Sequence, residues 1–105
     1  MDEQQFADRL AALRIKKDVS AREMSLAIGQ NASYINRIEN KLNLPSMQAF
    51  FYICEYLDVT PAEFFDTHNS DPFKRREIMD ALRFLDARQL DIVLSVIQGL
   101  SGAKK

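Results

Sequence analysis

Apolar positions recur along the chain with the spacing of a helix, and no segment shows the sustained alternation of a half-buried strand. In a helix predicted over residues 3–17, Phe6, Leu10 and Leu13 fall on one side, with Ile15 as a further candidate for the inner face. The same spacing continues almost to the end of the sequence. The pattern therefore predicts an all-α protein.

Two short helices are predicted between residues 20 and 40. Ser20 and Glu23 have the spacing of a capping box at the start of the first helix. Ser25 is small where this helix must approach the next one closely. Gly29 is expected to end the helix, because glycine adopts a left-handed backbone at the least steric cost. The apolar side of this helix comprises Met24, Ala27 and Ile28.

The second of these helices is predicted to run from about Asn31 to Glu39. Asn31 has the side chain of a strong N-cap, and Asn40 tolerates the left-handed residue that ends a helix. Ile35 and Ile38 are expected to hold this helix against the core. The outward face then comprises Ala32, Ser33, Asn36 and Arg37.

Four further helices are predicted, and they begin at the capping residues Ser46, Thr60, Asp71 and Asp86. Proline follows two of these caps at the first helical position, where its missing N–H is not needed. The helix after Ser46 carries the broadest apolar stripe and is the predicted core helix. The core residues expected from this helix and the next are Met47, Phe50, Phe51, Ile53, Cys54, Leu57, Phe64 and Phe65.

A polar, turn-rich stretch at 68–71 predicts a linker between an amino-terminal domain over 1–67 and a helical hairpin over 72–105. The last helix of the hairpin carries two apolar strips. A lone hairpin cannot bury both, so a partner surface is needed. That surface belongs either to a second copy of the chain or to the amino-terminal domain. The strips comprise Leu90, Val93, Leu94, Ile97 and Leu100 on one side and Ile92 and Val96 on the other.

The distribution of charge is more informative than its total. The 105 residues carry a formal net charge of −1, but the stretch 14–41 holds six basic residues against three acidic ones. A locally basic surface on an acidic body suits a protein that binds a polyanion through a specific fit, because weak bulk attraction gives weak non-specific binding.

Several other classes find no support in the sequence. No apolar run approaches the roughly 20 residues that cross a bilayer, and the acidic first residues differ from a secretion signal. A single cysteine, Cys54, cannot form an internal disulfide, which favours a cytoplasmic protein. His68 stands alone, so no metal is expected. The sequence has no nucleophile–base pair and no glycine-rich phosphate loop, which argues against an enzyme and against a cofactor.

Two short capped helices joined by a glycine turn are the sequence form of a helix-turn-helix. From residue 9 to residue 66 the chain resembles the phage repressor and Cro-like helix-turn-helix family, also called the xenobiotic-response-element family. The strings that carry the resemblance include Arg-Leu-Ala-Ala-Leu-Arg at 9–14, Ser-Ala-Arg-Glu-Met-Ser-Leu-Ala-Ile-Gly at 20–29, Ser-Tyr-Ile-Asn-Arg-Ile-Glu-Asn at 33–40 and Pro-Ala-Glu-Phe-Phe at 61–65. The resemblance implies a five-helix DNA-binding domain in a homodimeric transcriptional regulator.

The resemblance also implies which residues contact base edges, namely Ala32, Ser33 and Arg37, with Asn36 nearby. Arg37 is the strongest candidate because a guanidinium can bind guanine O6 and N7 together. Asn36 can pair with adenine, and Ala32 can touch a thymine methyl group. The alternative for Arg37 is a solvated charge without a partner.

Phosphate contacts are implied at the start of the second helix, through Ser20, and at the end of the third, through Asn40 and Lys41. The family often has a phosphate-binding glutamine at position 21, whereas Ala21 has no donor, so Arg22 is expected to take this role. The family often has a glycine and then a basic residue after Glu-Asn, whereas Lys41 here precedes an apolar residue. The loop is therefore less positive than usual.

Three further residues have roles that the sequence leaves less defined. Asn31 caps a helix whose first amides can face a phosphate. Tyr34 either bonds a phosphate through its hydroxyl or packs on the neighbouring loop. Arg14 and Glu39 match an ion pair that, by the resemblance, ties the first helix to the third.

The leading hypothesis is a transcriptional regulator, with repression favoured. As a homodimer it binds an inverted repeat in double-stranded DNA, with the helix over 31–39 in the major groove. The alternative is a protein-interaction module, such as an antitoxin or a regulator-binding partner, with reduced or no DNA binding. The acidic total and Ala21 favour that alternative, whereas Arg37 and the polar outward face oppose it. The sequence identifies no small-molecule effector.

Overall fold

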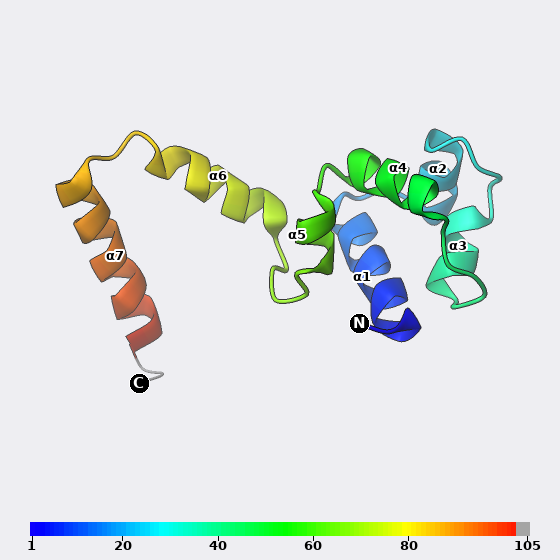
Figure 1. Cartoon of the computed structure of the whole chain (residues 1–105), viewed down its shortest axis with the longest axis horizontal. Helices are drawn as coiled ribbons and strands as arrows, with labels where there is room; N and C mark the ends of the chain where they lie inside the picture. The colour runs from blue at the N-terminus through cyan, green and yellow to red at the C-terminus, as the bar shows by residue number, and fades with distance from the viewer. Residues whose placement is uncertain (103–105) are drawn as a thin grey trace. The chain divides into compact units, whose positions relative to one another are not determined.

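The computed structural model describes residues 1–102, and all regular secondary structure within that range is helical (Figure 1). The last three residues of the predicted hairpin over 72–105 lie outside the described part. Residues 1–70 form one compact unit, and the chain from Asp71 forms a second. The helices are α1 (Glu3–Lys16), α2 (Ala21–Ala27), α3 (Tyr34–Glu39), α4 (Met47–Leu57), α5 (Pro61–Phe65), α6 (Pro72–Leu82) and α7 (Ala87–Ser101).

Side-chain caps begin six of these helices. The five predicted at Ser20, Ser46, Thr60, Asp71 and Asp86 are confirmed, because each side chain accepts a bond from a backbone N–H three residues later. Asp2 caps α1 in the same way. Each such cap stabilises its helix by about 1 kcal/mol, which explains why local sequence alone locates these helix starts.

The core of the first unit lies where its five helices, α1 to α5, meet. Phe6, Phe50 and Phe64 form its aromatic centre, with ring centroids 5.0 to 5.9 Å apart. The other large side chains that are fully buried in this unit are Leu10, Leu13, Met24, Ile35, Ile38, Ile53 and Leu57.

Five residues that were predicted to face the core are exposed. Ile15 and Ala27 are exposed rather than on an inner face. Met47, Phe51 and Phe65 are about half exposed or more, at 66%, 52% and 49%. The buried stripe of α4 is narrow, because the other four helices of the unit cover only one side of it, and Met47 and Phe51 lie outside that stripe. Phe65 follows the fully buried Phe64 by one residue, and consecutive helical side chains point in different directions.

Arg9 joins α1 to α5 from within the core. Its side chain is only 6% exposed, and it donates to the carbonyl oxygens of Phe64 at 2.7 Å and Glu63 at 2.6 Å. These carbonyls belong to the last turn of α5, where the helix leaves acceptors unpaired and where a cation is favoured. Burial lowers the pKa of Arg9, and the charge of Asp66 opposes that shift.

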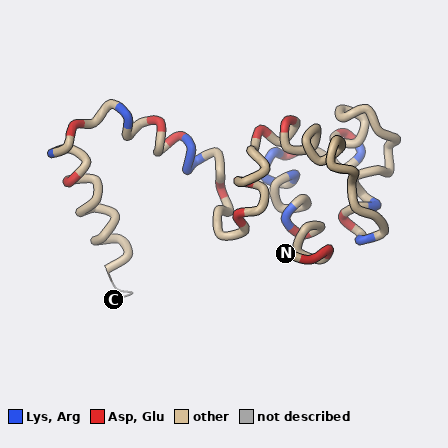
Figure 2. The backbone as a smooth tube through the Cα atoms, viewed as in Figure 1, with Lys and Arg blue, Asp and Glu red and all other residues tan. Residues whose placement is uncertain are grey.

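The second unit contains α6 and α7 and buries little of its apolar surface. The large apolar side chains of α7 are half-buried at Val93 and between 41% and 83% exposed at Leu90, Ile92, Leu94, Val96, Ile97 and Leu100. Residues 92–102 include no charged side chain, as the unbroken tan segment in Figure 2 shows. Within the second unit itself, both predicted strips are therefore largely exposed. None of the described helices is long and apolar enough to cross a membrane.

Candidate nucleic-acid interface

A glycine turn connects α2 to α3. Gly29 has a φ of 80°, and its N–H donates to the carbonyl of Leu26 while that of Gln30 donates to Ser25. These two bonds form the Schellman arrangement that ends many helices. A Cβ at Gly29 would meet nothing within 4 Å. Glycine is therefore required by the left-handed backbone and not by lack of space.

The sequence predicts that α3 begins directly after this turn, at about Asn31. The structure differs, because residues 31–33 precede the helix. The carboxamide oxygen of Asn31 accepts from the backbone N–H of Ser33 at 3.1 Å and from its hydroxyl at 2.9 Å. Asn31 therefore closes a local turn two residues onward, as asparagine often does outside helices. The helix begins at Tyr34, and Ser33 occupies the cap position without a side-chain cap. The predicted N-cap at Asn31 is wrong.

A residue of α2 provides the missing cap. The Ser25 hydroxyl oxygen accepts from the buried N–H of Ile35 at 2.9 Å and donates its own proton to the carbonyl of Ala21 at 2.7 Å. It satisfies one of the amides that the start of α3 leaves without a helical partner. The sequence indicated only that Ser25 is small. The short spacing of local caps gives no signal that its hydroxyl accepts from an N–H ten residues away.

The end of α3 differs from the prediction by one residue. Asn40 has an ordinary φ of −92°, and Lys41 is left-handed, with a φ of 63°. The N–H groups of Lys41 and Leu42 close a second Schellman arrangement with Ile38 and Arg37. The Asn40 carboxamide instead donates to the backbone and side-chain oxygens of Asn36, at 2.8 and 3.0 Å.

An ion pair fixes the carboxy-terminal part of α3 to α1. Arg14 donates through Nε and Nη2 to the two carboxylate oxygens of Glu39, at 2.7 and 3.0 Å, and through Nη1 to the carbonyl of Val19 at 2.9 Å. Both side chains are largely buried, at 17% and 13% exposed. The bonds to Glu39 raise the pKa of Arg14. Two-point pairing of this kind sets direction as well as distance.

The opposite side of this segment presents polar groups to solvent. Ser33, Asn36 and Arg37 are exposed, and Ala32 is half-buried. The guanidinium of Arg37 has no bonding partner within the described chain. The side-chain oxygen of Asn36 is held by Asn40, which fixes the amide and leaves its own hydrogens available to a ligand. The face can therefore donate several hydrogen bonds from a fixed backbone.

The candidate phosphate contacts are accessible to solvent to different degrees. Ser20, Arg22, Asn31, Asn40 and Lys41 are exposed, and Tyr34 is half-buried, which raises the pKa of its hydroxyl. The basic positions of the 14–41 stretch are distributed over α1, α2 and the end of α3 (Figure 2).

Glu23 places a negative charge at the start of α2. Its carboxylate lies 3.4 Å from the backbone nitrogen of Ser20, as part of the capping box. A carboxylate in this place opposes the approach of a phosphate to the helix end. Arg22 is exposed in the same turn of α2 and supplies a positive charge that opposes this repulsion.

Comparison with known proteins gives one finding that covers this region. A family model described as helix-turn-helix matches residues 10–64, just over half of the chain, from α1 to the buried Phe64 of α5. Neither the curated proteins nor the solved structures yielded a match. The chain belongs to the helix-turn-helix family of the phage repressor and Cro-like type, which consists of DNA-binding transcriptional regulators and not of enzymes.

Proposed function

We propose that this protein is a transcriptional repressor that binds an inverted-repeat operator as a homodimer, with α3 in the major groove. The observation that carries the proposal is the exposed polar face of α3, which the Ser25–Ile35 bond and the Arg14–Glu39 pair hold in one orientation. A face fixed in this way can match hydrogen-bonding groups on base edges. In this proposal the first unit binds double-stranded DNA and needs no cofactor.

The proposed base contacts come from the segment 32–37. Arg37 binds a guanine through two N–H donors, Asn36 pairs with adenine, and Ala32 touches a thymine methyl group with Ser33 beside it. The proposed phosphate contacts come from Ser20, Arg22, Asn31, Tyr34, Asn40 and Lys41. These contacts position the protein and the base contacts give the sequence preference.

The second unit provides the proposed dimer interface. The uncharged segment 92–102 exposes a density of large aliphatic side chains that is unusual for a monomer. Two copies joined through α7 would present two copies of α3 to half-sites about 34 Å apart on the DNA. The interface residues are Leu90, Ile92, Val93, Val96, Ile97 and Leu100.

Three observations favour a second candidate, a protein-interaction module with reduced DNA binding. Ala21 stands at the first position of α2 and has no donor, Glu23 adds a negative charge beside it, and the net charge is −1. These features weaken the non-specific electrostatic attraction on which DNA affinity largely depends. They do not affect the polar face of α3.

Selection of bound sequences from random duplex DNA, at about physiological salt, tests both candidates. Wild type, Arg37→Ala and a matched control, Arg88→Ala in α7, are compared in parallel. Arg37→Ala should lower the specific affinity by about 1–3 kcal/mol and relax one position in each half-site. Arg88→Ala removes the same charge from an exposed site on the second unit and should recover the wild-type sequence.

The outcomes separate the two functions. An inverted repeat from wild type, blurred at one position per half-site by Arg37→Ala, supports the repressor proposal. A folded wild-type protein that enriches no sequence contradicts it and favours the interaction module. Equal effects of the two arginine variants would show that Arg37 contributes only its charge.

A further inference from the structure

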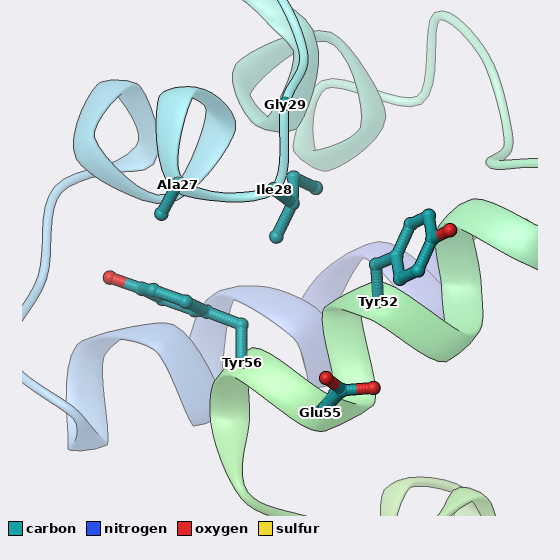
Figure 3. Close-up of a pocket in the computed structure, with 6 residues that line it drawn as sticks. All are labelled: Ala27, Ile28, Gly29, Tyr52, Glu55 and Tyr56. Carbon is teal, nitrogen blue, oxygen red and sulfur yellow. The ribbon is translucent and has the colours of Figure 1, made fainter.

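An open groove lies between the end of α2 and the middle of α4 (Figure 3). Its volume is about 450 Å³, which is within the range of sites for small organic ligands. It lies in the first unit and does not include the base-contacting residues. Its lining comprises Ala27, Ile28 and Gly29 from α2 and its turn, and Tyr52, Glu55 and Tyr56 from α4.

The two tyrosines give the groove aromatic walls. The ring of Tyr56 extends beneath Ala27, the ring of Tyr52 stands at the other end, and Ile28 points toward the space between them (Figure 3). Aromatic rings carry negative charge on their faces and attract cations. Tyr56 already holds a cation of the chain itself, because Nζ of Lys17 lies 5.3 Å from its ring centroid. The ring of Tyr52 has no such cation among the described residues and is the one open to a ligand.

Glu55 adds a full negative charge to the same helix. Its carboxylate lies farther from Ala27 and Ile28 than the two tyrosine rings do (Figure 3), at an edge of the groove that it helps to line. It is exposed and has no bonding partner among the residues that the structure describes. Aromatic rings, a carboxylate and the aliphatic surface of Ile28 together favour an organic cation with an apolar body. An anionic ligand would be repelled by Glu55, and a neutral one would leave it unused.

We propose that this groove binds a small organic cation, such as a quaternary ammonium or a protonated arylalkylamine, whose charge lies against Glu55 and the ring of Tyr52. Ile28 and Gly29 belong both to the groove and to the turn that leads to α3, so a bound ligand contacts the connection that positions the recognition face. Binding there is coupled to DNA affinity, and by linkage the coupling acts in both directions. This regulatory role rests on the proposed function, whereas ligand binding does not.

The experiment follows the backbone amide signals of the full chain by NMR during titration with benzyltrimethylammonium, without DNA. We expect the largest changes at residues 27–29 and 52–56, with a dissociation constant of about 1 mM for so small a probe. Glu55→Gln should weaken binding about fivefold and Tyr52→Leu about threefold. Both side chains are exposed, so these variants keep the fold.

Three controls separate the site from general charge effects. Glu3→Gln removes the same charge elsewhere on the first unit and should bind the probe as wild type does. Benzyl alcohol supplies the ring without the cation and should leave the groove signals unchanged. Shifts that are equal with benzyl alcohol, or equal affinities of wild type and Glu55→Gln, would overturn the site.

DNA affinity for the selected operator is then measured with the probe or with an equal concentration of sodium chloride, which matches the ionic strength without supplying an organic cation. An affinity change of about fivefold at saturation supports the regulatory role. An unchanged affinity with the groove occupied would overturn that role. Because ligand binding is measured without DNA, failure of the site and failure of operator binding are distinguished.

Discussion

The two units of this chain are built from equally well-formed helices but differ in what those helices bury. In the first unit, α1, α2 and α4 begin at side-chain caps, and α1 to α4 end in left-handed residues. In the second unit, α6 and α7 also begin at caps, and α7 has a complete capping box. Yet the first unit has a closed core around Phe64, whereas most large side chains of α7 are exposed.

This difference shows that helix formation and burial are specified separately. A cap and a favourable composition define where a helix begins, but isolated helices of this length are marginally stable in water and depend on tertiary packing. The first unit supplies that packing itself through contacts between helices far apart in sequence. The second unit leaves most of its large apolar side chains exposed, and in the proposed dimer the interface with a second copy would cover them.

The largest effect should follow a charge placed in that interface. Ile97→Asp puts a carboxylate on the apolar strip of α7, where it would lack a partner. Burying this unpaired charge should make the free energy of dimerisation less favourable by about 3 kcal/mol or more. The dissociation constant of the proposed dimer should therefore rise at least about 100-fold. Sedimentation equilibrium at several concentrations measures this change.

Ser95→Asp is the matched control for Ile97→Asp, because Ser95 lies outside both apolar strips and bonds the carbonyl of Asp91. It should leave the dimer nearly intact. If Ile97→Asp also leaves the dimer unchanged, α7 is not the interface and the contrast between the units needs another explanation.

The next effect concerns the first unit, where packing and hydrogen bonding act together. Ser25→Ala leaves the buried N–H of Ile35 without an acceptor, which should lower the free energy of unfolding by about 1–3 kcal/mol. Ser33→Ala removes a hydroxyl whose bond to Asn31 is at the surface and should cost about 0.5 kcal/mol. Urea denaturation gives both values, and equal losses would contradict the role of Ser25 as a cap for α3.

This cap also marks the limit of what sequence could predict. The side-chain caps of α2, α4, α5, α6 and α7 and the exposed face of Asn36 and Arg37 follow from residues only a few positions apart, and the sequence located them. The bonds from Ser25 to α3 and from Arg9 to α5 join residues 10 and 55 positions apart. Such contacts depend on how helices pack, which no periodicity encodes.

The same limit explains the errors in burial. The apolar stripe of α4 is continuous in sequence, but how much of it is covered depends on the number and length of its neighbours. Phe51 and Met47 therefore looked like core residues and are exposed. The left-handed residue at the end of α3 is Lys41 and not Asn40, because the hydrogen-bond pattern at the helix end decides this position over residue preference.

A thiol in the core of the first unit provides a test by pH. Burial raises the pKa of Cys54 to about 11 from its ordinary value of 9.0, so between these values the unfolded chain loses a proton that the folded one keeps. The contribution of the thiol to the free energy of unfolding is fully present below pH 9. Between pH 9 and about 11 it falls by about 1.4 kcal/mol per pH unit. The free energies of unfolding of wild type and Cys54→Ala are measured at pH 8 and at pH 10. The change in their difference between the two pH values gives the contribution that the thiol loses. A difference that does not change with pH would show that the thiol is accessible to water in the folded unit.

The smallest effect separates local backbone strain from packing. Lys41 has a left-handed backbone at the end of α3, where a Cβ costs about 1 kcal/mol that glycine avoids. Lys41→Gly should therefore raise the free energy of unfolding by somewhat less, about 0.5 kcal/mol, because glycine also gains entropy in the unfolded chain. Gly29→Ala makes the reverse change at a φ of 80° and should destabilise the unit by about 1–2 kcal/mol. Parallel urea titrations should give changes in the free energy of unfolding of opposite sign, because neither substitution alters the core. Changes of equal sign would mean that side-chain contacts, not backbone conformation, set the stability of these two turns.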